Sequence, residues 1–439
     1  MKWDTFYIAI FLIVTIFLLR PEPTRADSVI APVRFVEPAG KITLADAIKA
    51  ALENNPDISA ATHEINARES AQIQEGFLAN PTFFSEFEEF GGSGELSGDD
   101  ALGTTVGVSQ EIPLAGKRAK RLRVAGYETV VARLEYQAKI LALTSDVKKR
   151  FLKINSLEQG LLLEKENIAL LQDAHDVISR QIALGDISPL DEKKARVELA
   201  LAKTALSRAK RELEMARIEL ASSWGSRDVH FDQIELIDLE IRPLPKESDL
   251  WQAVQAHPEI GINRIQIERS KVSLALAKAD AIPDLEVEGG VKYSNESNEH
   301  AYFIGFSMPI PVFDRNKGGI LEASEKIKVG KKELDSSTLR MRTELAVLLE
   351  HLQIIDAELG TTETTIIPAA QEAYEAMKKA YQAGEKDYLE LLDSQRTLLE
   401  VRRRNLLLEM EHHELIADLE GITGQDLESF SRNYPGMPE

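Results

Sequence analysis

Glu390 and Asp393 are the carboxylates whose spacing most suggests a function. They lie three residues apart, so both project from one face if the segment is helical. A purely structural role would also explain them. Asp387 can cap such a helix, Glu390 can close a capping box, and Asp393 in the first turn interacts favourably with the helix dipole. An earlier, similar segment has Asp191 and Lys194 at the corresponding positions. The second segment therefore has a carboxylate where the first has a lysine.

Histidines are the other residues that could do chemistry. The densest group is Glu411-His412-His413-Glu414, but neighbouring residues point about 100° apart on a helix and cannot readily share one ion. Glu409 and His413 are spaced i, i+4 and could bind one ion together. A solvated polar helix face is nevertheless the preferred interpretation. We therefore assign no metal site and no cofactor. The isolated histidines are His63, His175, His230, His257, His300 and His351.

No catalytic residue is expected, because the chain has no phosphate loop, nucleophile motif or paired-histidine zinc motif. The chain is therefore not predicted to be an enzyme.

Both acidic segments follow a glycine suited to the left-handed position that ends a helix. A capping residue comes next in each case, and Pro189 occupies the first helical position after the first tip. The sequence thus predicts two helical hairpin tips in a duplicated chain. The tip residues are Gly185, Asp186, Ile187 and Ser188 in the first copy, and Gly384, Glu385, Lys386 and Asp387 in the second.

Long helices must position these tips. Residues 117–184 contain no proline, and apolar residues recur there every seven positions, as they do in the second copy, which is typical of coiled coils. About 65 helical residues make a rod on the order of 100 Å long. Helices return over 189–224 and 388–423, and Pro368 is expected to kink the second rod. The heptad residues are Ile140, Val147, Ile154, Leu161 and Ile168, then Ile320, Ile327, Leu334, Met341, Leu348 and Ile355.

Four segments switch to the period of two that marks strands. Their length of about 9–11 residues is enough to cross a bilayer when tilted, although two ordinary hairpins on a soluble core fit the pattern equally well. Four strands cannot close a barrel, so a membrane interpretation needs several copies, and three copies would give twelve strands. The strands are expected at about 82–90, 104–112, 284–293 and 301–310.

Composition fits long helices and an export route. Aromatic residues make up 6% and charged residues 28% of the 439 residues, and the net charge is −20, so nucleic acid is an unexpected partner. A fourteen-residue apolar run within residues 1–26 predicts a signal peptide, in preference to a retained anchor. The expected order is then a leader at 27–42, a first repeat at 43–227, a connector at 228–247, a second repeat at 248–424 and a tail at 425–439.

In order and spacing, these motifs resemble the outer-membrane factor family, the TolC-like exit ducts of tripartite efflux and type I secretion systems. The branch that serves heavy-metal resistance-nodulation-division pumps is the most similar. Many family members carry an N-terminal lipidated cysteine, whereas this chain has no cysteine. The residues that carry the resemblance are Thr43-Leu44-Ala45-Asp46-Ala47, Asn55-Pro56, residues 87–94, residues 112–118 and Tyr388-Leu389-Glu390-Leu391-Leu392-Asp393.

The resemblance implies a mainly α homotrimer in the Gram-negative outer membrane. Its twelve-stranded β-barrel would sit in lipid and continue into a periplasmic α-barrel tunnel. Glu390 and Asp393 match the acidic residues that ring the tunnel mouth in this family, and three copies would supply six carboxylates. Asp191 and Lys194 become candidate gate-supporting residues. A periplasmic adaptor would dock at both tips, alongside an inner-membrane resistance-nodulation-division pump.

The predicted function is therefore a gated, passive exit duct, with divalent heavy-metal cations as the expected cargo. Drug efflux or type I protein secretion through the same duct is the alternative. A soluble periplasmic adaptor or coiled-coil scaffold would share the long hairpins but would not need the two strand pairs.

Overall fold

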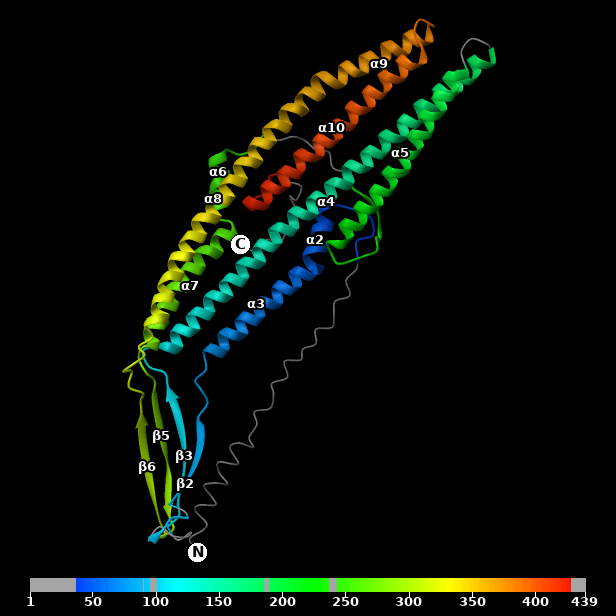
Figure 1. Ribbon diagram of the computed structural model, residues 1–439. Coiled ribbons are helices and arrows are strands. Elements are labelled where there is room, and N and C mark those ends of the chain that lie inside the picture. The colour runs from blue at the N-terminus through cyan, green and yellow to red at the C-terminus, as the bar shows by residue number, and fades with distance from the viewer. Residues whose placement is uncertain (1–36, 90, 95–100, 185–188, 237–242, 428–439) are drawn as a thin grey trace. The chain divides into compact units, whose positions relative to one another are not determined.

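The computed structural model describes residues 37–89, 91–94, 101–184, 189–236 and 243–427 (Figure 1). The predicted signal peptide, most of the predicted leader and first-tip residues 185–188 lie outside these ranges. None of the helices in the described ranges combines the length and apolar character needed to span a bilayer.

Helices dominate the described chain, and α4 is the central one. It has 68 residues, which corresponds to about 100 Å at the usual helical rise. α3, α5, α7 and α10 all pack against α4. The helices are α2 (Leu44–Asn54), α3 (Pro56–Glu75), α4 (Lys117–Leu184), α5 (Pro189–Ser222), α6 (Glu247–Gln255), α7 (Pro258–Asp280), α8 (Lys317–Thr361), η2 (Thr362–Ile366), α9 (Ile367–Gln382) and α10 (Tyr388–Thr423).

Local sequence explains where the short helices start. Thr43 and Asp46 form the capping box at the start of α2, with the Asp46 amide donating to Thr43 Oγ1 at 3.1 Å. Asn55 caps α3 through its side chain, and Pro56 takes the first turn, where its missing N–H costs nothing. His257 and Pro258 repeat this arrangement at the start of α7. The helix interruptions expected at the two proline motifs are confirmed.

The second long rod contains a π-helical turn, η2, directly before α9. The sequence predicted a kink at Pro368, which lies in the first turn of α9. Proline lacks a backbone N–H, and its ring clashes with the carbonyl four residues earlier, here that of Thr364 inside η2. The disturbance therefore appears as a widened turn on the N-terminal side of the proline.

The four longer strands form one antiparallel sheet in the order β2-β3-β5-β6. The two central strands come from different copies of the repeat, and their register pairs Gly107 with Gly290. β2 and β6 are the edge strands, and each is paired on one side only within the described chain. The strands are β2 (Thr82–Glu88), β3 (Gly103–Ile112), β5 (Leu285–Ser294) and β6 (Glu299–Ser307).

The two faces of this sheet differ in chemistry. Residues paired across antiparallel strands share a face, and by this register all charged side chains of the four strands fall on one face. The opposite face is mainly apolar and uncovered, with Tyr302, Ile304 and Phe306 of β6 exposed by 79%, 76% and 70%. The charged residues are Glu86, Glu88, Glu111, Glu286, Glu288, Lys292 and Glu299.

A second, small sheet joins the start of the first repeat to the segment between the repeats. β1 (Gly40–Ile42) pairs in parallel with β4 (Phe231–Ile234). The Trp224 ring packs edge-on against Phe231 at 6.1 Å between centroids. The end of α5 meets the start of α3 nearby, since Gly225 lies against Pro56.

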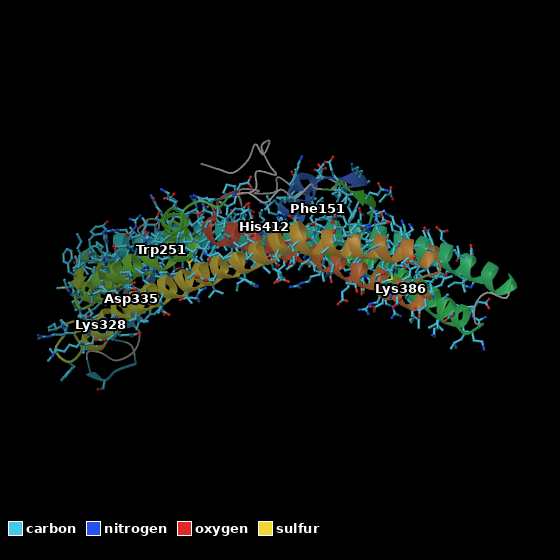
Figure 2. All side chains as sticks on the ribbon, turned by 90° about the horizontal axis from the view of Figure 1, so that it is seen from above. Phe151, Trp251, Lys328, Asp335, Lys386 and His412 are labelled. Carbon is cyan, nitrogen blue, oxygen red and sulfur yellow. The ribbon has the colours of Figure 1, made fainter. Side chains whose placement is uncertain are left out.

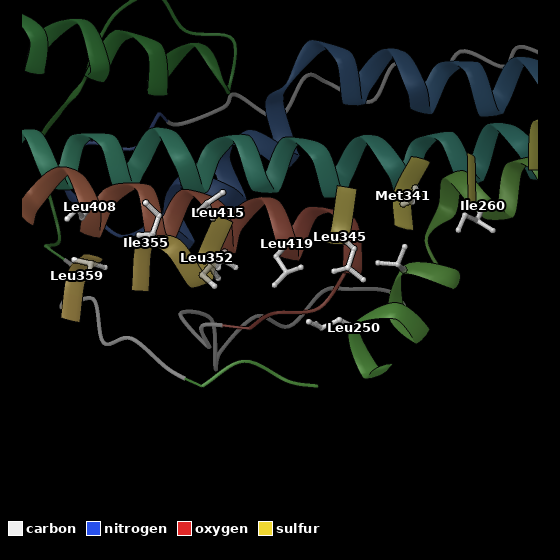
Figure 3. Close-up of a cluster of buried hydrophobic side chains, with 12 residues drawn as sticks. Leu250, Ile260, Met341, Leu345, Leu352, Ile355, Leu359, Leu408, Leu415 and Leu419 are labelled. Atoms are coloured by element: carbon white, nitrogen blue, oxygen red, sulfur yellow. The ribbon is translucent and has the colours of Figure 1, made fainter. Parts of the chain in front are cut away.

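A cluster of twelve buried apolar residues ties α6 and α7 to α8 and α10 (Figure 3). Two of the predicted heptad residues, Met341 and Ile355, are buried there, with 1% and 3% exposed. In α4 the heptad residues Val147 and Ile154 are fully buried. The seven-residue period therefore marks the side of each rod that faces its neighbours. The cluster is Leu250, Val254, Ile260, Met341, Leu345, Leu352, Ile355, Leu359, Leu408, Leu415, Ile416 and Leu419.

Candidate functional site

The turn between α9 and α10 is a Schellman motif. Gly384 has a φ of +76°, its amide donates to the carbonyl of Tyr381, and the Glu385 amide donates to that of Ala380, both at 3.0 Å. The predicted left-handed glycine is confirmed. The motif satisfies carbonyl groups that the helix end would otherwise leave unpaired, so the chain reverses within a few residues.

The start of α10 departs from the expected capping box. Asp387 caps the helix as predicted and accepts the Glu390 amide at 3.0 Å. Glu390 does not return the bond to the backbone of Asp387. Its carboxylate instead accepts from the ammonium of Lys386 at 2.8 Å, because Lys386 lies four residues earlier and its long side chain reaches over the first turn. Figure 2 shows Lys386 at this end of the helices.

Asp393 is exposed one turn further along α10. The corresponding residues of the first hairpin, Asp191 and Lys194, approach each other at 3.7 Å on one turn of α5. In the first hairpin, the charge of Asp191 is therefore compensated by Lys194 on the same helical turn. On α10, Glu390 is compensated by Lys386, and no ion pair is recorded for Asp393 in the described part of the chain.

Polar bonds join the two hairpins one turn behind this acidic face. Arg396 of α10 pairs with Glu198 of α5, whose side chain is only 17% exposed. Gln395, which is buried, donates to Asn167 Oδ1 of α4 at 3.1 Å. These bonds hold α10 against both helices of the first hairpin near the tips.

Two tyrosines fill the space between the hairpins. Tyr388 is 4% exposed and packs among Leu171, Ile178 and Leu199, and its ring lies 6.3 Å from that of Tyr381. Burial, reinforced by the nearby charge of Glu198, raises the pKa of Tyr388 to about 12. Burial and then the charge of Asp191 raise the pKa of Tyr381. Both hydroxyls stay protonated at physiological pH, so the contact between the hairpins carries no phenolate charge.

The predicted first-tip residues Gly185, Asp186, Ile187 and Ser188 lie outside the described residues. Of the predicted second-tip residues, Gly384, Glu385, Lys386 and Asp387 are all exposed. The structure thus shows four accessible residues at the second tip.

The histidine group is buried, which corrects the expectation of a solvated face. His412 and His413 are 3% and 1% exposed, and His412 Nδ1 lies 2.7 Å from Asp356 of α8. Burial, and then the charge of Glu363 in η2, raise the pKa of Glu409. Within the described ranges, no group of three or more histidine, aspartate or glutamate side chains is arranged to hold a metal ion.

Sequence reasoning missed the contacts that surround the acidic face. The pair of Lys386 with Glu390 could have been found from its spacing of four, which is a standard helix-surface pair. The contacts of Glu198, Asn167 and Tyr388 could not, because their partners lie on other helices and depend on how the hairpins pack. Arg396 was visible only as one of many charged residues of a long helix.

A family model described as outer membrane efflux protein matches residues 47–226 and 250–425. The chain is 28% identical to the cobalt-zinc-cadmium resistance protein CzcC of Cupriavidus metallidurans over 398 residues, covering 89% of this chain and 91% of that protein. It is 21% identical to the cation efflux system protein CusC of Escherichia coli over 380 residues, covering 81% and 80%. The crystal structure of the outer membrane protein VceC of Vibrio cholerae has a similar fold, with a TM-score of 0.74, 17% identity and coverage of 88% and 97%.

Proposed function

The chain belongs to the outer membrane efflux protein family, and on that premise we propose that three copies form a gated duct that carries divalent heavy-metal cations out of the cell. The resemblance to the outer-membrane factors of heavy-metal efflux systems is confirmed by the family match and by the relatives. The chain is an outer-membrane efflux channel, and its family points to transport rather than catalysis.

The two-faced sheet is the observation that carries the proposal of a trimer. Its apolar face is large and uncovered, and its other face holds six carboxylates and one lysine. A bilayer requires that strand edges be paired, because unpaired backbone groups are costly in lipid. β2 and β6 leave such edges open, so further copies are needed. Three copies would make twelve strands, with the apolar face toward lipid and the carboxylates toward the pore.

The acidic face of α10 would then stand at the far end of the duct. Three copies would bring together Glu390 and Asp393 as a ring that favours cations. The bonds of Arg396 and Gln395 to the first hairpin would keep this mouth closed. An adaptor protein that engages the exposed residues 384–387 would compete with these contacts and open the duct. Asp191 and Lys194 would support the closed state from the neighbouring hairpin.

Cation cargo is supported by charge and by the relatives. The chain carries a net charge of −20, and carboxylates on one face of the sheet would line the pore. The similar proteins are named for cobalt-zinc-cadmium resistance and for cation efflux. An inner-membrane resistance-nodulation-division pump and a periplasmic adaptor would deliver the metal, and the helices would extend through the periplasm.

Single-channel recording in planar bilayers tests the duct and its ring together. The wild-type protein should conduct with cation selectivity and should be blocked by multivalent cations. Glu390→Gln/Asp393→Asn should lose much of both properties. A matched control is Glu372→Gln/Glu375→Gln, which also removes two acids spaced three apart, here on α9. Unchanged selectivity and block in the first double variant would rule out the ring.

The cargo needs a separate experiment in the source organism. Deleting the gene should raise sensitivity to zinc, cobalt or cadmium and leave resistance to organic drugs unchanged. Sensitivity to drugs alone, or loss of a secreted protein, would instead assign the duct to the alternative cargoes.

A further inference from the structure

The junction between the sheet and the long helices carries an unusual concentration of positive charge. Residues 113–126 contain five cations and no carboxylate, and residues 308–321 contain two cations and one carboxylate. Together these stretches carry a net charge of +6, that is 5 + (2 − 1), in a chain whose net charge is −20. The cations are Lys117, Arg118, Lys120, Arg121 and Arg123 at the start of α4, and Arg315 and Lys317 at the start of α8.

These cations are not explained by helix stability. The first turn of a helix favours negative charge, and neither α4 nor α8 has an acidic residue there. Lys117 does have a structural role. It is buried and pairs with Asp284 at 2.8 Å, which links the two repeats. Arg121 approaches Glu75 at 3.6 Å. Within the described ranges no carboxylate lies at ion-pair distance from Arg118, Arg123, Arg315 or Lys317, and all four are exposed.

Hydrogen bonds show that the helix starts and helix ends meet at one level of the fold. Arg118 Nε donates to the carbonyl of Gly76, just after α3, at 2.6 Å. Asn316, at the start of α8, donates to the carbonyl of Ala277 in α7 at 2.8 Å. Figure 1 shows the ends of α3, α4, α7 and α8 meeting the sheet. The exposed cations without an ion pair therefore lie at one level, where the long helices meet the sheet, and the bond of Lys117 to Asp284 joins the two repeats there.

An apolar rim adjoins these cations in the segment between β6 and α8. Phe313 is 101% exposed, so its ring has no covering contact, and Ile310 and Val312 are 83% and 64% exposed. Met308, at 52%, continues this rim to the uncovered apolar face of β6. Aromatic and apolar side chains next to cations are typical of the boundary between the acyl chains and the headgroups of a bilayer.

We propose that this junction surface, formed by Arg118, Arg123, Arg315 and Lys317 with the rim Met308, Ile310, Val312 and Phe313, binds anionic phospholipid headgroups. The phosphates belong to the leaflet on the helix side of the bilayer, and the rim inserts among the acyl chains beneath them. The inference rests on the proposed function, because that function places the sheet in a membrane. Charge complementarity and continuity with the lipid-facing side of the sheet select a lipid as the occupant.

Lipid retention measured by native mass spectrometry tests this surface. The full-length protein is reconstituted with phosphatidylethanolamine and phosphatidylglycerol, extracted, and its bound lipids are counted. Arg123→Gln/Lys317→Gln removes two exposed cations that make no recorded bond. The retained ratio of phosphatidylglycerol to phosphatidylethanolamine should fall roughly fivefold for each cation removed. Raising the salt concentration should reduce the preference of the wild-type protein as well.

A matched control is Lys210→Gln/Arg211→Gln, which removes one lysine and one arginine from the exposed surface of α5. It should keep the wild-type lipid ratio. A ratio unchanged in Arg123→Gln/Lys317→Gln, or lowered equally in the control, would overturn the proposal. A salt-independent preference would do so too.

Phe313→Ser tests the rim without disturbing packing. It should lower the total number of lipids retained and leave the trimer intact. Loss of the trimer in detergent would instead make the rim a contact between copies. Channel recording on the same samples separates the two proposals, since conducting channels without lipid preference would refute only the junction surface. Absence of channels would refute the duct.

Discussion

The ammonium of Lys386 lies 2.8 Å from a carboxylate oxygen of Glu390. One of the two acids proposed for the duct mouth is thus compensated within its own chain, whereas Asp393 is exposed. A ring built from this chain would therefore have a charge that depends on a lysine as well as on its carboxylates.

Replacing Lys386 by Gln should increase cation selectivity and strengthen block by multivalent cations, because each chain would add one uncompensated charge at the mouth. Single-channel recording measures both properties. Lys379→Gln, an exposed lysine in the last turn of α9, is the matched control and should have a smaller effect. Equal effects of the two substitutions would show that only the overall charge matters.

Gly384→Ala should destabilise the second tip by about 1–2 kcal/mol, because a left-handed residue with a Cβ is strained. No atom lies within 4 Å of the added methyl group, so the cost is that of the backbone alone. Gly360→Ala, in a helical position that is also open, should stabilise by about 0.5–1 kcal/mol. Opposite shifts in apparent Tm in detergent are expected. A neutral Gly384→Ala would mean that the tip turn can adopt another conformation.

Gly290→Ala should destabilise the sheet by about 1–3 kcal/mol through overpacking. A Cβ there would overlap the carbonyl oxygen of Val106 and lie 2.9 Å from the Phe303 ring. The neighbouring Gly289→Ala meets only the carbonyl oxygen of Phe303, at 3.6 Å, and should be tolerated. The yield of heat-resistant oligomer on gels compares the two variants. Similar yields would show that β5 does not keep this register.

Lys148→Met should destabilise the contact between α4 and α10 by about 3–5 kcal/mol, because it strands the buried carboxylate of Glu420. The two side chains are only 9% and 7% exposed. Lys153→Met breaks an exposed pair with Glu219 and should cost no more than about 1 kcal/mol. Thermal unfolding measures both. Equal costs would place Glu420 in contact with water.

Glu409→Gln should stabilise the protein at neutral pH. Burial and the charge of Glu363 raise the pKa of Glu409 in the folded protein. The protonated side chain therefore stabilises the fold fully below the ordinary pKa of 4.5. This stabilisation is lost as the pH rises through the raised pKa of the folded protein. Apparent Tm should therefore rise for Glu409→Gln at neutral pH and differ little from wild type in acid. Glu400→Gln, an exposed acid on the same helix, should show no such dependence. An unshifted Tm for Glu409→Gln at neutral pH would contradict the raised pKa.

Local features of the fold were readable from the sequence. Thr43 caps α2 and Gly384 ends α9 because each interaction joins residues only a few positions apart. The bounds of α4 follow from a proline-free heptad pattern between a turn and a tip, and α10 begins directly after the cap of the second tip. Such features depend on propensity and spacing, which one sequence contains.

The predictions that were wrong or missing concern packing between distant segments. His412 and His413 look polar in sequence, but α4 and α8 cover the side of α10 that carries them. The carboxylate of Glu390 could accept a hydrogen bond from either the Asp387 amide or Lys386. Side-chain geometry decides between these two donors. The bond of Arg396 to Glu198 requires the two hairpins to lie in one register, which no local pattern specifies.

The open edges of β2 and β6 have a consequence for how the protein reaches its final state. A single folded copy presents two strands ready for pairing beside an uncovered apolar surface, which is the arrangement that drives aggregation in water. For the proposed trimer, assembly and membrane entry would therefore occur together, or the lone chain would be shielded until they do. Because the same edges could add copies without limit, the proposed copy number of three would have to be set by another part of the chain, for which the long helices are the candidate.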